Sequence, residues 1–147
     1  MMTMAPDPLE RFVRAQARDY AQALAELVAG RKRSHWIWYV LPQLRALGRS
    51  AMAREYGIAG RTEAAAYLAH PVLGPRLREC VQALLVHAGR DAAYILGEVD
   101  AMKFRSCLTL FAAVAPDEPM FTSALAAFYD GQPDEATLRL LAADAPA

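Results

Sequence analysis

The sequence predicts an all-α protein, folded as a compact single-domain bundle of short helices. It contains 31 Ala and 18 Leu but only 16 residues of Val, Ile and Thr together, a balance that favours helices over strands. Hydrophobic residues make up 55% of the 147 residues and charged residues 22%, which suits one self-supporting core. Apolar residues recur at helical spacing in segments of 8 to 16 residues. We expect one domain over residues 7–142, with flexible termini at 1–6 and 143–147.

Two segments of the first half predict helices with defined ends. Apolar residues follow Pro8 at a 3.6-residue period until Gly30, as one helix or as two helices broken near Asp19. Thr62 is the expected N-cap of a short helix, which ends at His70 because a residue before proline avoids the helical region.

The second half predicts four helices. A stripe of leucines begins at Leu73 and ends before Gly89. Asp100 is the expected N-cap of the next helix, which Pro116 stops. The last two helices are predicted over residues 121–129 and around residues 138–141.

The aromatic segment 34–42 has no decisive pattern. An aromatic, β-branched sequence of this length is as typical of a strand as of a short buried helix.

Charge is unevenly distributed although the net charge is zero. Residues 31–61 contain seven basic residues and one acidic residue, whereas residues 116–147 contain one and six. Guanidinium groups beside aromatic rings suit a small anionic, nucleotide-like ligand. Alternatively, the acidic C-terminal helices fold against the basic segment and neutralise it. No basic surface extends over the whole domain, so weak RNA binding is the only nucleic-acid interaction left open.

The basic aromatic segment supplies most of the candidate site residues. His35 is the candidate general acid or base, although it also suits a hydrogen-bonded histidine at the start of a buried element. Lys32 and Arg33 are candidates for holding anionic groups. Trp36 and Trp38 either stack on a base or ribose or belong to the core.

Two further positions complete the candidate ligand site. Ser50 either caps a following helix or, with Arg49, helps to hold a phosphate. Lys103, at the margin of an apolar helix face, either lies along the surface or reaches into a pocket. Arg105 points to the other side of the same helix and is included as a ligand-binding candidate.

Several classes of protein are disfavoured. The His and Cys residues lack the spacing of metal ligands, and there is no nucleophile elbow or glycine-rich dinucleotide loop, so we expect neither a metal nor a cofactor. The N-terminus does not resemble a secretory signal. The longest apolar stretch, 106–116, is about half of the ~20 residues that span a bilayer, so we expect a cytoplasmic protein with no membrane partner.

Five sequence motifs carry a resemblance to a known family, and they comprise residues 29–38, 41–43, 47–50, 66–74 and 103–106. The sequence resembles a bacterial family of unknown function, some members of which carry the automatic label calpastatin. The resemblance covers residues 7–141. It implies a small multihelical fold and a short helix for the aromatic segment, but no activity. A calpastatin role is excluded because such an inhibitor is a long disordered chain, whereas this sequence has the apolar residues of a folded core. Cys107 stands where the family more often has Ser, which argues against an essential nucleophile.

The order of the motifs is also similar to that of helical N-glycosidases that act on ADP-ribose-linked nucleotides. This similarity implies a substrate class without assigning catalytic residues. Our leading hypothesis is a protein that binds a phosphorylated nucleotide-like or ADP-ribose-like ligand, with N-glycosidic hydrolysis as the reaction to test. The alternative is a non-enzymatic protein–protein interaction module, including a homo-oligomer, that uses the basic segment and the acidic C-terminal region.

Overall fold

The computed structural model describes residues 7–144, and over that range the chain forms nine α-helices, one 3-10 helix and no strand. The all-α prediction is therefore confirmed. The elements are α1 (Glu10–Ala29), α2 (Ile37–Val40), η1 (Arg45–Leu47), α3 (Ala51–Glu55), α4 (Arg61–Ala69), α5 (Leu73–Leu85), α6 (Ala92–Leu96), α7 (Glu98–Val114), α8 (Pro119–Tyr129) and α9 (Glu135–Ala143).

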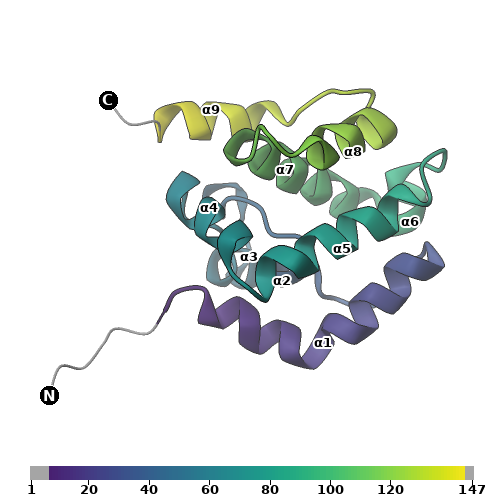
Figure 1. Ribbon diagram of the computed structural model, residues 1–147, viewed down its shortest axis with the longest axis horizontal. Coiled ribbons are helices and arrows are strands. Elements are labelled where there is room, and N and C mark those ends of the chain that lie inside the picture. Colours follow the sequence, from purple (N-terminus) through teal and green to yellow (C-terminus); the bar gives the residue numbers. More distant parts are fainter. Residues whose placement is uncertain (1–6, 145–147) are drawn as a thin grey trace, which may run out of the picture.

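The helices pack around α4, α5 and α7 (Figure 1). α1 lies on one side against α2 and α5, and α8 and α9 lie on the other side against α7. One continuous apolar cluster joins all of these layers, which makes the chain a single domain. Its largest fully buried side chains are Trp36, Tyr67, Phe12, Phe104, Phe111 and Phe121.

The first helix is continuous through Asp19. α1 ends at Ala29 because Gly30 adopts a left-handed conformation with φ of 78°, and the Gly30 N–H bonds to the carbonyl of Leu27. The aromatic segment forms the short helix α2, whose Ile37, Tyr39 and Val40 are buried. Of the two alternatives for this segment, strand or short buried helix, the structure has the helix, which packs against α1.

Two predicted N-caps are wrong. α4 begins at Arg61 rather than after Thr62, and the Arg61 N–H donates to the Asp144 carboxylate at 2.8 Å, so the end of α9 caps α4. α7 begins at Glu98, after Gly97 with its φ of 88°. Asp100 therefore lies inside the first turn of α7, where its carboxylate can contact other elements.

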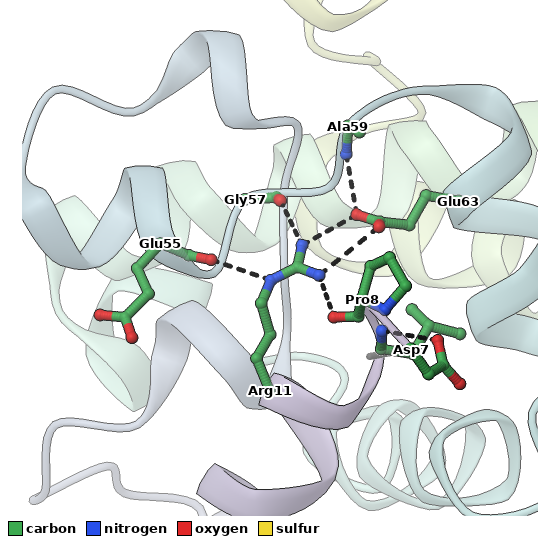
Figure 2. Close-up of polar contacts among 8 residues, drawn as sticks. Asp7, Pro8, Arg11, Glu55, Gly57, Ala59 and Glu63 are labelled. Atoms are coloured by element: carbon green, nitrogen blue, oxygen red, sulfur yellow. Dashed lines mark hydrogen bonds and ion pairs between the residues drawn. The ribbon is translucent and has the colours of Figure 1, made fainter. Parts of the chain in front are cut away.

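Arg11 ties α1 to the segment between α3 and α4 (Figure 2). Its guanidinium donates to the carbonyl of Glu55 at 2.9 Å and to that of Gly57 at 2.8 Å, and it forms an ion pair of 2.8 Å with Glu63. The same Glu63 carboxylate accepts the Ala59 N–H at 3.0 Å. Residues 55–59 are consequently anchored to both α1 and α4.

The expectation of flexible termini at 1–6 and 145–147 lies outside the described residues. Ala143 and Asp144, also expected in the C-terminal tail, form the end and the C-cap of α9. Between residues 7 and 144, no helix has the length and apolarity needed to cross a membrane.

Candidate functional site

A cleft of about 470 Å³ lies between the segment 43–53 and α7, and we call it the η1–α7 cleft. η1 and α3 supply one wall, α7 supplies the other, and the start of α9 closes one end. The lining residues are Gln43, Leu47, Gly48, Arg49, Ser50, Ala53, Val99, Met102, Lys103, Ser106, Asp134 and Ala136. Three of the predicted ligand-binding residues, Arg49, Ser50 and Lys103, are therefore brought together from distant parts of the chain.

The two cations of the cleft differ in their surroundings. Arg49 is exposed on the irregular segment before α3. Lys103 is 24% exposed, and its ammonium lies 3.9 Å from the Asp100 carboxylate and 5.2 Å from the centre of the Trp38 ring. At 3.9 Å the contact with Asp100 is too long for a hydrogen bond, which leaves the donors of Lys103 available to a ligand.

Ser50 acts as a helix cap, one of its two predicted roles. Its hydroxyl accepts the Ala53 N–H at 3.1 Å, as an N-cap serine does. α3 is only five residues long. We therefore assign the positive character of this wall to Arg49 rather than to the helix end.

The only two lysines of the sequence share one carboxylate. The Lys32 ammonium lies 2.8 Å from Asp100 and 4.9 Å from the centre of the Trp36 ring, and only 7% of its side chain is exposed. Lys103 approaches the other oxygen of the same carboxylate. Lys32 thus contacts the site through Asp100 and does not line the cleft.

Glu26, in α1, accepts hydrogen bonds from several residues of the predicted basic aromatic segment. Its buried carboxylate accepts hydrogen bonds from the backbone N–H groups of Arg33 and Ser34, at 2.8 and 2.9 Å, and from the Trp36 indole at 2.9 Å. Burial would raise the pKa of this carboxyl, but the hydrogen bonds, above all those from the Ser34 hydroxyl and the Arg33 N–H, lower it to about 2. Trp36 is fully buried here and belongs to the core.

The remaining predicted site residues lie outside the cleft lining. Arg33 and His35 are exposed on the segment between α1 and α2. Arg105 donates to the carbonyl of Gln132 at 2.8 Å, so it joins α7 to the segment between α8 and α9. Trp38 lines a smaller cavity of about 10 Å³, which shares Gln43, Ala53 and Lys103 with the cleft.

Three polar residues of the cleft were missed by sequence reasoning. Gln43 lies between buried residues, the Ser106 hydroxyl donates to the Met102 carbonyl at 3.2 Å, and the Asp134 carboxylate accepts the Thr137 N–H at 2.9 Å as the N-cap of α9. Ser106 was visible as a neighbour of Lys103 on one helix. Nothing in the sequence indicates that Gln43 or Asp134 lies in the same cleft as Ser106 and Lys103.

Charge distinguishes this cleft from two others of about 430 Å³ each. One, beside the two ends of the described chain, is lined by Asp7, Glu63 and Asp144 and by no basic residue. The other has three arginines and three carboxylates. The η1–α7 cleft has two cations, Arg49 and Lys103, against Asp134 alone, so it is the one of the three that suits an anion.

Metal and thiol chemistry have no visible site within residues 7–144. No group of three or more His, Cys, Asp or Glu is placed to hold a metal there. Burial raises the pKa of the Cys80 thiol to about 12 and also raises that of Cys107, so both thiols stay protonated at neutral pH.

The acidic C-terminal helices do not neutralise the basic segment by ion pairs. Within the described chain, no side-chain ion pair joins a basic residue of 31–61 to a carboxylate of 116–144. α9 contacts η1, and Arg61 adds hydrogen bonds: its backbone N–H donates to Asp144 and its side chain donates to the Leu141 carbonyl at 3.2 Å.

Comparison with known proteins identifies relatives whose function is unknown. Residues 6–141 match the family described as "Protein of unknown function (DUF1810)". The fold is similar to the crystal structure of the conserved hypothetical protein Rv1873 from Mycobacterium tuberculosis, with a TM-score of 0.91 and 47% identity over 94% of this chain and 99% of that one. No curated protein matches the chain significantly. Neither match names a calpastatin or a glycosidase.

Proposed function

Because this chain belongs to DUF1810, a family of proteins of unknown function, we propose its function from its own η1–α7 cleft: binding of a small phosphorylated, nucleotide-like ligand. The observation that carries the proposal is the meeting of Arg49 and Lys103 across a cleft that has only one carboxylate in its lining. The cleft volume of about 470 Å³ lies within the range of roughly 300–1,000 Å³ that is typical of small-molecule sites.

The lining supplies separate contacts for the two halves of such a ligand. The Arg49 guanidinium forks onto phosphate oxygens, and Lys103 adds a second positive charge. Leu47, Val99 and Met102 offer apolar surface to a base or ribose. Val99 is 66% exposed and Met102 is 71% exposed, so this surface is open to a ligand from solvent.

A thermal-shift titration with AMP, IMP, ADP-ribose and inorganic phosphate tests the proposal. A ligand at 100 times its dissociation constant adds about 2.7 kcal/mol, which raises the Tm of a protein of this size by roughly 5 to 10 °C. We expect this shift with wild type and its loss in Arg49→Ala and in Lys103→Met, which keeps the apolar stem.

Arg31→Ala is the matched control, because Arg31 is an exposed arginine of the same basic segment outside the cleft. Its shift should equal that of wild type. An equal loss in all three variants would indicate diffuse charge attraction, and no shift in wild type would refute the cleft as a nucleotide site.

Hydrolysis of an N-glycosidic bond is the finer part of the proposal. His35 stays the predicted acid–base residue, although its exposed side chain is outside the cleft lining. The same samples are assayed by chromatography for release of base from nucleotide. Turnover that His35→Ala abolishes without lowering the Tm would support the assignment, and equal turnover in that variant would overturn it.

The alternative function is an interaction module that uses the basic segment. It is favoured by the absence, between residues 7 and 144, of ion pairs that join this segment to the carboxylates of residues 116–144. Such a module would capture a protein partner or a second copy with an affinity that falls as salt is added. Ligand binding that survives in a salt-insensitive monomer would count against it.

A further inference from the structure

The indole N–H of Trp38 is a buried hydrogen-bond donor without an acceptor among the described residues. Its neighbour Trp36 differs, because the Trp36 indole donates to Glu26 at 2.9 Å. Buried donors are nearly always partnered in folded proteins, so an orphaned one calls for an acceptor that comes from outside the chain.

The position of Trp38 is next to the proposed ligand site. Trp38 lines the small cavity beside the η1–α7 cleft, and Gln43, Ala53 and Lys103 line both spaces. The Lys103 ammonium lies 5.2 Å from the centre of the Trp38 ring. Trp38 and Lys103 therefore border the same small cavity, which we call the inner end of the cleft, and the ammonium lies over the face of the Trp38 ring.

The size of the small cavity limits what can enter it. About 10 Å³ is room for roughly one water-sized atom. A carbonyl oxygen that projects from a ring fits such a space, whereas a ring nitrogen is flanked by its neighbours in the ring. An exocyclic amino group is itself a donor and meets the indole N–H and the ammonium unfavourably.

We propose that the inner end of the cleft recognises an exocyclic carbonyl oxygen of the ligand's base, with the Trp38 indole N–H as its donor. The inference rests on the proposed nucleotide site and narrows its ligand to 6-oxopurine or related oxo-base nucleotides. Lys103 lines both spaces and keeps its proposed role with Arg49 toward the phosphate, so the indole N–H is the donor assigned to the base.

IMP and AMP form the matched pair of probes, because they differ at the 6-oxo and 6-amino position. We expect IMP to bind at least about tenfold more tightly than AMP in calorimetry, since a site built around a donor rejects a ligand that lacks the acceptor. Trp38→Phe, which removes the indole donor but keeps an aromatic ring next to Lys103, should abolish the preference for IMP over AMP.

Proton–nitrogen correlation spectra provide a readout that needs no variant to fold. The two tryptophans give two indole signals, and IMP should move one of them downfield while AMP and inorganic phosphate leave it in place. Backbone signals of the cleft that move equally with IMP and AMP, without an indole shift, would overturn this inference and leave the proposed function standing. No movement of cleft signals with any probe would overturn both.

Discussion

At the scale of single residues, two carboxylates, one buried and one partly buried, fix the least regular segment of the chain. Glu26 gathers the backbone of Arg33 and Ser34 and the indole of Trp36 around one carboxylate. Asp100 does the same for the two lysines. Because each carboxylate has donors around it, the segment between α1 and α2 needs no regular secondary structure to be ordered.

Glu26→Gln tests this role of the carboxylate. The amide keeps the shape but replaces charge-assisted hydrogen bonds with neutral ones, so we expect a loss of about 1 to 2 kcal/mol in the free energy of unfolding at pH 7. Urea titration measures it. Glu55→Gln, on the exposed α3, is the control and should change stability by less than about 0.5 kcal/mol.

The pH dependence follows from the lowered pKa of Glu26. The pKa falls from an ordinary 4.5 to about 2 on folding, so the ionised carboxylate adds stability above pH 4.5. This contribution disappears as the pH falls from 4.5 through about 2. The stability difference between wild type and Glu26→Gln should therefore close over that interval, and a difference independent of pH would show that the charge is not the cause.

At the scale of elements, helix ends contact the backbone or side chains of other helices. A Cβ at Gly74, near the start of α5, would lie 2.1 Å from the carbonyl oxygen of Leu68 in α4. A Cβ at Gly60 would lie 2.5 Å from the Asp144 carboxylate, which caps α4. The first obstacle is backbone and the second is a side chain that can rotate away.

Gly74→Ala and Gly60→Ala should therefore differ although the substitution is the same. We expect Gly74→Ala to cost at least about 2 kcal/mol, since α4 and α5 must separate. Gly60→Ala should cost about 1 kcal/mol, the value of the lost cap, and nothing further when Asp144 is already alanine. Thermal unfolding of the two glycine variants, of Asp144→Ala and of the Gly60→Ala/Asp144→Ala double variant measures this, and equal costs for the two glycines would contradict the close approach of α4 and α5.

At the scale of the whole molecule, the two ends of the described chain border one cavity. Asp7 and Asp144 both line it. α4 and α5 lie between the long helices α1 and α7, because α5 contacts α1, α4 contacts α7, and α4 and α5 contact each other. We therefore expect the fold to depend on the contacts between its helices and not on where along the chain the ends lie.

A circular permutant tests this expectation, because it moves the chain ends and keeps the helix contacts. Joining Ala147 to Met1 supplies the nine residues outside 7–144, which span up to about 30 Å. With new ends between the exposed Gly89 and Arg90, we expect cooperative unfolding with a Tm within about 5 °C of wild type. A permutant opened between Phe104 and Arg105, inside α7, should not fold. Failure of both would show that the ends are not close enough to be joined.

Sequence reasoning recovered the helical class and most helix positions. The stripes of α1, α5, α7, α8 and α9 repeat at 3.6 residues and are punctuated by glycine and proline, which are local signals. The N-caps at Thr62 and Asp100 were wrong because partners distant in sequence determine those ends. Asp144, 83 positions from Arg61, replaces the cap that Thr62 was expected to supply.

The candidate site was also predicted only in part from the sequence. Composition and local charge were enough to single out the basic aromatic segment, the paired tryptophans and the rare lysine of α7, because residue types are read directly from the chain. Only the tertiary structure separated Trp36, which is bonded to Glu26, from Trp38, whose indole has no acceptor within residues 7–144. It alone set Arg49 opposite Lys103, because their proximity depends on how α3 and α7 pack, and packing depends on the shape of the whole core.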